Sequence, residues 1–135
     1  MSGERYPVLW IGQVAVVTLP AEIDVTNADA IREELLAVLN QGAVMLVADM
    51  NRTDFCDSSG VSALVRVFRH AATSATALRL VVTTPTVLRV LSITGVDRLV
   101  DVYPSVAASL GGPNGHLDQA WPDGATAKAD TDGGA

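Results

Sequence analysis

The sequence predicts a single α/β domain, in which a mixed central sheet of about four or five strands carries about three or four helices. Short segments rich in β-branched residues alternate with longer segments whose apolar residues recur at helical spacing. Such alternation is typical of βαβ units. A tight turn at Gly12-Gln13 predicts that the first two strands form an antiparallel hairpin, which makes the sheet mixed. The length of 135 residues suits one domain.

The first half of the chain predicts short strands and one helix. The strands cover residues 8–11, 14–19 and 44–48. The last of these is apolar throughout, as expected for a strand that is covered on both faces. The helix is predicted to begin at a cap formed by Thr26 or Asn27 and to end at Asn40. Its predicted buried residues are Ala28, Ile31, Leu35, Val38 and Leu39.

The second half predicts two further helices, two strands and a last helical turn. The next helix begins at Ser58, after a polar loop over residues 49–57. Its predicted buried stripe consists of Val61, Leu64, Val65, Phe68 and Ala72. A third helix is predicted from Pro85 to Gly95, because proline suits a first helical turn and glycine a helix end. The remaining elements are strands over 78–82 and 99–103 and a helical turn over 105–110.

The composition changes at the end of the predicted domain, which covers residues 1–110. Residues 111–135 hold 6 of the 11 glycines and show no apolar periodicity. A segment with so little apolar surface cannot offset the entropy lost when a chain becomes ordered. We therefore expect residues 111–135 to form a flexible tail rich in glycine, aspartate and alanine.

The charge balance and the rarity of cysteine exclude several classes of protein. Nine basic residues stand against fifteen acidic ones, for a net charge of −6. This balance argues against a nucleic-acid partner and against docking on an anionic membrane. A single cysteine excludes an internal disulfide, and together with two histidines it argues against a structural zinc site. The sequence has no glycine motif for binding phosphate, so no cofactor is expected. Without a signal peptide or a spanning apolar segment, the protein is expected to be cytoplasmic.

The junction before the second helix is the most informative segment. In open α/β sheets, ligands and partners usually bind where a strand region leads into a helix. Asp57, Ser58 and Ser59 are therefore either part of a binding site or only an ordinary helix cap, with either serine as the capping residue. A hydrolase with Ser58 as nucleophile is the least favoured alternative, because His70 lies roughly 18 Å along the same helix and cannot act as its base. Cys56 is either a redox input or, as we prefer, a small buried residue packed beside Phe55.

The run Asp57-Ser58-Ser59-Gly60 resembles the phosphorylation motif of STAS domains, specifically that of bacterial anti-sigma factor antagonists. Other segments are similar to the family in the same order, and the resemblance extends over residues 8–110. They are residues 20–25, 47–50 and 92–100. Three departures from the family pattern stand out: Pro20-Ala21 replaces the usual glycine of the early segment, Ser62 stands where many members have glycine, and Cys56 lies at the edge of the motif.

The resemblance implies a regulatory protein that is not an enzyme. The unphosphorylated antagonist binds an anti-sigma factor with serine kinase activity, and a sigma factor is released. The kinase then phosphorylates the first serine of the motif, here Ser58, and a phosphatase removes the phosphate. The implied partner-binding residues are Asp24, Asn27, Asp57, Ser58, Ser59, Gly60 and Ser62.

Other interpretations remain open at this point. The domain could be a STAS scaffold in a signalling or transport assembly, with Ser58 never phosphorylated, or a small nucleotide-binding protein. On the exposed side of the same helix, Ser62, Arg66 and Arg69 form either a second contact strip or an ordinary solvated face.

Overall fold

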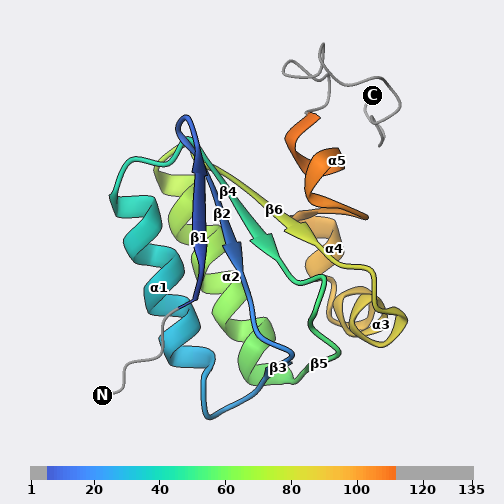
Figure 1. Ribbon diagram of the computed structural model, residues 1–135. Helices are drawn as coiled ribbons and strands as arrows, with labels where there is room; N and C mark the ends of the chain where they lie inside the picture. Colours follow the sequence, from blue (N-terminus) through green and yellow to red (C-terminus); the bar gives the residue numbers. More distant parts are fainter. Residues whose placement is uncertain (1–5, 112–135) are drawn as a thin grey trace.

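The computed structural model describes residues 6–111, which form one main sheet with helices on both faces (Figure 1). The strand order is β1-β2-β4-β6-β7. The strands are β1 (Val8–Ile11), β2 (Val14–Thr18), β4 (Met45–Asp49), β6 (Ala77–Val81) and β7 (Asp101–Tyr103). The first two pair antiparallel, and every later pair is parallel, so the sheet is mixed as predicted.

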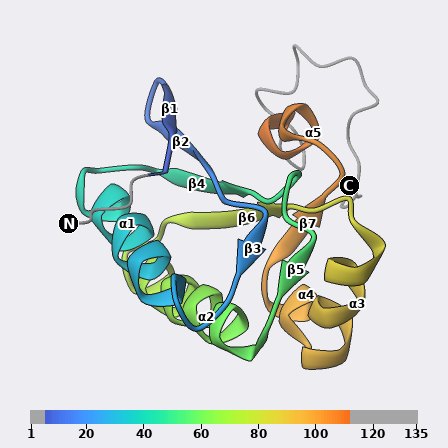
Figure 2. The same ribbon diagram turned by 60° about the horizontal axis from the view of Figure 1, so that its bottom comes forward.

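The helices divide unequally between the two faces of the sheet. They are α1 (Ala28–Asn40), α2 (Ser58–Thr73), α3 (Pro85–Thr94), α4 (Val96–Leu99) and α5 (Val106–Gly111). Helices α1 and α2 cover one face, and α5 lies on the opposite face (Figure 2). The larger apolar core lies on the α1–α2 side, and α3 and α4 contribute to it. A smaller cluster of Val16, Val47 and Val81 lies on the other face, where Val106 and Leu110 of α5 pack against it.

Most predicted elements are confirmed to within one or two residues. The hairpin turns at Gly12-Gln13, where Gly12 has a φ of +63°. All five residues predicted to be buried on the first helix are buried in α1. Pro85 occupies the first turn of α3, and Gly95 ends that helix in the left-handed conformation with a φ of +84°. Proline therefore begins this helix and glycine ends it, for the expected backbone reasons.

The buried stripe of α2 differs from the prediction. Val61 and Leu64 are buried as predicted, whereas Val65 and Phe68 are only partly buried and Ala72 is exposed. The rest of the stripe consists of Gly60, Ala63, Val67 and Ala71. Small residues let the helix backbone approach its neighbours closely, and a pattern built on large apolar side chains overlooks them.

Two very short strands were not predicted. They are β3 (Glu22–Ile23) and β5 (Phe55–Cys56), which pair with each other in parallel, separately from the main sheet. The segment 49–57 is therefore more than the polar loop expected. The last predicted strand is also shorter, because residues 96–99 form α4 and the strand begins at Asp101.

The end of the described chain coincides with the end of α5 at Gly111. The other residues of the predicted tail lie outside the described residues. Within residues 6–111, no helix is both long enough and apolar enough to cross a membrane.

Candidate functional site

The short β3–β5 pair brings two distant segments of the chain together at one end of the domain. Ile23 lies opposite Cys56, and the N–H of Asp57 donates to the carbonyl of Ile23 at 3.1 Å. Asp24 and Asp57, which directly follow the two paired strands, therefore lie on the same surface. The N-termini of α1 and α2 lie at this end of the molecule as well (Figure 1). The predicted site residues from both segments are thus brought into one region.

The N-terminus of α2 is capped by Asp57 and not by either serine. The Asp57 carboxylate accepts hydrogen bonds from the N–H groups of Ser59, at 2.9 Å, and Gly60, at 3.3 Å. An aspartate in this position satisfies backbone donors, and its negative charge interacts favourably with the positive end of the helix dipole. Ser58, the first residue of α2, is exposed, and Ser62 is exposed one turn further along.

Asp24 belongs to a loop that its own side chain stabilises. Its carboxylate accepts from the Thr26 hydroxyl at 2.5 Å and from the Thr26 N–H at 2.9 Å. These hydrogen bonds, the side-chain one first, lower the pKa of Asp24, so the group is ionised at neutral pH. Asn27 fixes the loop from the other side, accepting from the Asp24 N–H at 3.0 Å and donating to the Glu22 carbonyl at 2.8 Å. Asn27 is thus a positioning residue for Asp24.

Gly60 is buried in α2, and its implied contact with a partner stays a prediction. A Cβ at this position would lie 2.6 Å from Cγ2 of Ile23 and 2.7 Å from Sγ of Cys56. The close neighbours of Gly60 are thus the side chains of β3 and β5. Glycine here lets α2 pack directly on the short strand pair.

Cys56 is almost fully buried, with 4% of its surface exposed. Burial, and then the nearby Asp57 carboxylate, raise the pKa of the thiol to about 11. Reactive cysteines have lowered pKa values and accessible sulfur atoms, so this environment argues against a redox input. The geometry favours the packing role, although Phe55 does not share the burial: it is 47% exposed.

Two exposed apolar side chains beside the site escaped the sequence-based reasoning. Val25, in the loop after β3, is 74% exposed, and Phe55 of β5 is 47% exposed. Alternation along a strand turns Phe55 outward when Cys56 turns inward, but a strand of two residues gives no readable pattern. An exposed aromatic and an exposed valine next to an exposed serine are typical of a surface that binds another protein.

The carboxylate of Asp49 serves the local backbone. Asp49 accepts from the N–H of Asn51 at 3.0 Å, as a turn-forming residue does. Within residues 6–111, no three His, Cys, Asp or Glu side chains lie close enough together to hold a metal ion.

Comparison with known proteins assigns the family. The sequence pattern of the STAS domain matches residues 8–109, which is most of the chain and all of its regular structure up to α5. The chain therefore belongs to the STAS domain family.

Several of the proteins that this chain resembles are named anti-sigma factor antagonists. The anti-sigma-B factor antagonist of Bacillus subtilis (strain 168) is 28% identical over 86 residues, which make up 64% of this chain and 78% of that protein. An anti-sigma factor antagonist from Mycobacterium paratuberculosis, solved by crystallography, shares 25% identity with a TM-score of 0.69, over 76% of this chain and 86% of that one. The Bacillus cell fate determinant SpoIIAA in its phosphorylated form shares the fold, with 22% identity and a TM-score of 0.59 over 75% and 93% of the two chains.

Proposed function

We propose that this protein is a cytoplasmic anti-sigma factor antagonist and that Ser58 is its switch. In the unphosphorylated form it binds an anti-sigma factor with serine kinase activity, and a sigma factor is released. The kinase phosphorylates Ser58 and thereby ends the binding, and a phosphatase restores it. In this proposal the protein acts by binding alone, without catalysis, a cofactor, a nucleic acid or a membrane.

The observation that carries the proposal is the exposed Ser58 hydroxyl at the start of α2. Within residues 6–111 its side chain makes no hydrogen bond, so a kinase can reach it without disrupting the fold. At the same end of the domain lie the ionised Asp24, the capping Asp57 and the exposed apolar side chains of Val25 and Phe55. This combination of polar and apolar groups suits a protein partner.

The charge on a phosphate explains how the switch acts. Phosphoserine adds about −1.5 to −2 charges at neutral pH. Because Asp57 already accepts from the N–H groups of Ser59 and Gly60, a phosphate on Ser58 finds those donors occupied and a carboxylate beside it. The added charge therefore projects toward the partner, where repulsion and desolvation oppose binding.

A comparison of three baits tests the proposal. Wild type, Ser58→Glu and Ser92→Glu are used to capture proteins from the lysate of the source cell, and captured proteins are identified by mass spectrometry. Ser92 is an exposed serine of α3, so Ser92→Glu makes the same change in charge away from the candidate site. Wild type and Ser92→Glu are expected to capture a protein with a serine-kinase ATPase fold, whereas Ser58→Glu is not. If all three baits capture the same assembly, the protein is a STAS scaffold and Ser58 is no switch.

The phosphorylation site is tested with the captured kinase. Wild type and Ser92→Ala are expected to incorporate phosphate from labelled ATP, and Ser58→Ala is expected to bind the kinase but to incorporate none. Phosphate on the Ser58→Ala protein would move the site, most simply to Ser59, and would contradict the assignment of Ser58.

A further inference from the structure

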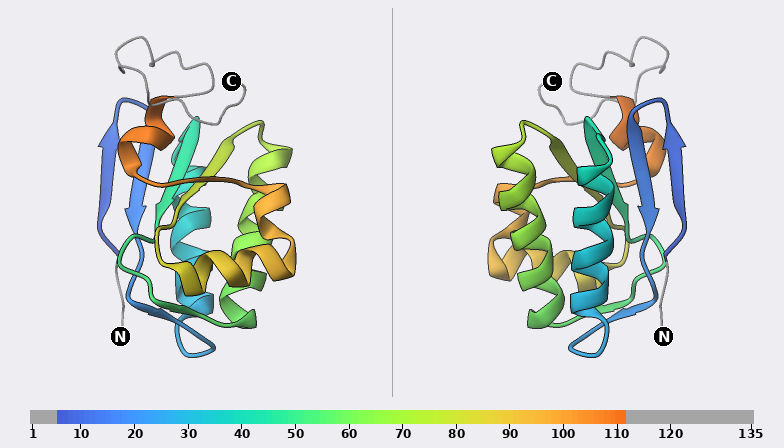
Figure 3. Two further views of the ribbon diagram at one scale, coloured as in Figure 1. Left: turned by 90° about the vertical axis from the view of Figure 1, so that its right-hand side faces the viewer. Right: turned by 90° about the vertical axis from the view of Figure 1, so that its left-hand side faces the viewer.

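A groove runs along the outer surface of α1 and α2 and begins beside Ser58. It consists of two adjoining hollows of about 390 and 400 Å³, which share Arg32 of α1 and Arg66 of α2. Ser59 lines the first hollow, and Arg69 lines the second. The two helices lie side by side and run in the same direction (Figure 3). The groove therefore leads away from the proposed switch toward the C-terminal ends of both helices.

The groove is basic, although the chain as a whole has a net charge of −6. Three of the seven arginines in residues 6–111 converge on it: Arg32, Arg66 and Arg69. Among residues 6–111, the only carboxylate that lines it is that of Asp29, which is bound to Arg32 at 2.9 Å. Glu33, outside the lining, approaches Arg32 at 4.0 Å.

Arg66 and Arg69 carry the unmatched charge. Both side chains are exposed, and within residues 6–111 neither forms an ion pair or a hydrogen bond. Arg32 is only 26% exposed in its side chain, so its guanidinium is held in place at the groove, although Asp29 and Glu33 partly offset its charge. Two free cations and one fixed cation thus face the same solvent-filled groove.

The spacing along α2 sets the size of an occupant. Ser59, Ser62, Arg66 and Arg69 follow one another by three or four positions, so they share one side of the helix. From Ser59 to Arg69 the helix rises roughly 15 Å, at about 1.5 Å per residue. An extended chain covers that length with about four or five residues, at roughly 3.3 Å per residue. The groove therefore matches a short extended segment in length.

We propose that this groove docks an acidic, extended segment of the same protein partner that binds at Ser58. The guanidinium group of arginine matches the geometry of a carboxylate, and two such groups on one side of a helix suit Asp or Glu side chains that alternate along a segment. The proposal rests on the proposed function for the identity of the partner. It adds a second docking surface, which lies beyond the residues of the phosphorylation motif.

The two charged regions together give the binding surface a polarity. Asp24 and Asp57 make the end of the domain near Ser58 negative, and the arginines make the groove positive. Complementary charges on a partner increase the association rate and fix the orientation of docking more than they raise affinity. The groove thus directs the kinase so that its active site reaches Ser58.

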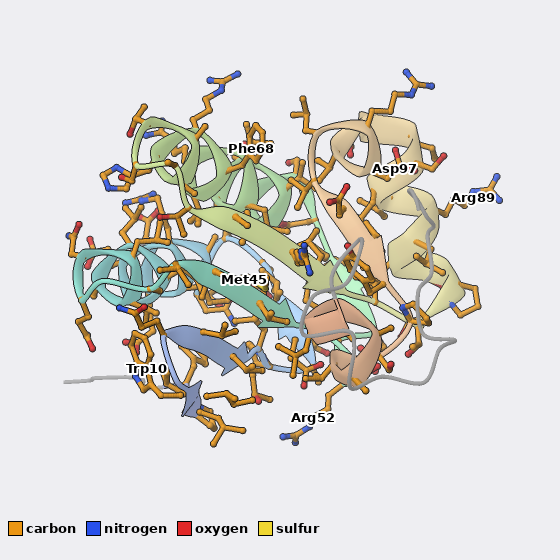
Figure 4. The ribbon with its side chains drawn as sticks, turned by 90° about the horizontal axis from the view of Figure 1, so that it is seen from above. Trp10, Met45, Arg52, Phe68, Arg89 and Asp97 are labelled. Carbon is orange, nitrogen blue, oxygen red and sulfur yellow. The ribbon has the colours of Figure 1, made fainter. Side chains whose placement is uncertain are left out.

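A pair of charge-reversed variants tests the groove. Arg66→Glu/Arg69→Glu reverses the two free cations, and Arg89→Glu/Arg98→Glu makes the same change in net charge on α3 and α4. Arg89 and Arg98 are exposed, and Arg89 points away from the body of the domain (Figure 4). With the kinase captured by wild type, the groove variant is expected to associate at least about tenfold more slowly at low salt, and the control less than about twofold. The difference is expected to shrink at high salt.

A peptide measurement tests the groove without the partner. An acetylated peptide of alternating Glu and Ser is titrated into ¹⁵N-labelled protein, next to the same peptide with Gln and to inorganic phosphate. Only the Glu peptide is expected to shift amide signals along α1 and α2, and the groove variant is expected to lose this response while the Arg89→Glu/Arg98→Glu protein keeps it.

The outcomes separate the groove from the proposed function. Equal association rates for wild type and the groove variant, or equal losses in both double variants, overturn the groove proposal. A similar response to the Gln peptide overturns it as well, and saturation by inorganic phosphate at lower concentration assigns a small-anion site instead. If Ser58→Glu still abolishes capture of the kinase in these cases, the proposed function stands without the groove. If no capture depends on Ser58, the proposed function fails, and the peptide titration alone decides the groove.

Discussion

Asp57 and Ser58 are neighbours in the chain with separate roles. The Asp57 carboxylate holds two N–H groups of α2, so it belongs to the fold. The Ser58 side chain is exposed and, within residues 6–111, makes no hydrogen bond, so the fold does not depend on it. A modification of Ser58 can therefore change the surface while the helix start remains intact.

This separation predicts that Ser58→Glu changes binding and leaves stability almost unchanged. Its free energy of unfolding is expected to lie within about 1 kcal/mol of the wild-type value, as for an ordinary surface change. Asp57→Ala, the matched control, removes the cap and is expected to cost about 1 kcal/mol or more. Urea titrations followed by circular dichroism measure both. A loss above about 2 kcal/mol in Ser58→Glu contradicts a switch that acts at the interface alone.

The buried environment of Cys56 predicts that its thiol reacts slowly and that the stability of the protein falls at high pH. Because the folded state raises the pKa of the thiol from 9.0 to about 11, it holds the proton more tightly than the unfolded chain does. This contribution to stability is complete below about pH 9 and is lost as the pH rises toward 11; two pKa units correspond to about 2 to 3 kcal/mol.

Two measurements check the environment of Cys56. With a disulfide reagent at pH 7.5, the folded protein is expected to react at least about tenfold more slowly than the chain unfolded in urea. Between pH 9 and 11, wild type is expected to lose more stability than Cys56→Ala, which removes the thiol but leaves Tyr103, whose pKa burial also raises. Equal reaction rates in folded and unfolded protein would restore the redox hypothesis.

At the scale of elements, the strongest periodic patterns were the ones that could be predicted. The five buried residues of α1 follow one apolar stripe, and α1 folds accordingly. In α2, Gly60, Ala63 and Ala71 form part of the buried side, and their small side chains carry no clear periodic signal. The strands β3 and β5 have two residues each, which is too short for a periodic pattern to be recognised. Their pairing is set by tertiary contacts and not by local propensity.

The residues of the motif around Ser58 could be predicted from the sequence, whereas the arrangement of the surface around them could not. The motif around Ser58 is continuous in sequence, so its residues could be named before the fold was known. The convergence of Arg32 with Arg66 depends on the side-by-side packing of α1 and α2, which the sequence does not display. Burial of Gly60 against Ile23 likewise depends on the unpredicted β3–β5 pair.

The contact between α2 and the short strands predicts that Gly60→Ala destabilises the protein. The new methyl group would meet Ile23 and Cys56 at 2.6 and 2.7 Å, and both neighbours are buried. Overpacking of this kind costs about 1 to 3 kcal/mol, and the better helix propensity of alanine offsets up to about 1 kcal/mol. A net loss of about 1 to 2 kcal/mol is therefore expected in a urea titration.

Ser62→Ala is the matched control for this contact, since it adds helix propensity on the exposed side of α2. Its stability is expected to equal or slightly exceed that of wild type. An increase of stability in Gly60→Ala as large as that in Ser62→Ala would show that α2 can move away from β3 and β5.

At the scale of the whole molecule, the two faces of the sheet have different tasks. The α1–α2 face holds the larger core, and the groove lies on the outer surface of these two helices. The opposite face is covered by the short α5, which packs on the sheet through Val106 and Leu110 and is also held by a buried arginine of β6. Arg79 of β6 is 8% exposed, donates to the carbonyl of Ser109, and lies with its guanidinium carbon 5.3 Å from the ring centre of Tyr103.

This attachment predicts that Arg79→Met releases α5 while the rest of the domain remains folded. Methionine fills a similar volume but leaves the Ser109 carbonyl without its donor, a loss of about 1 to 3 kcal/mol. Amide hydrogen exchange of residues 106–111 is expected to accelerate far more than that of β4, and Arg79→Lys is expected to lie between the two proteins because it keeps the charge. Burial raises the pKa of Tyr103 and Arg79 lowers it, so the variant should also raise that pKa further, as seen by ultraviolet titration. Capture of the kinase is expected to survive, since Ser58 begins α2, which lies on the opposite face of the sheet from α5 (Figure 2). If exchange accelerates equally in α5 and β4, Arg79 instead supports the whole sheet.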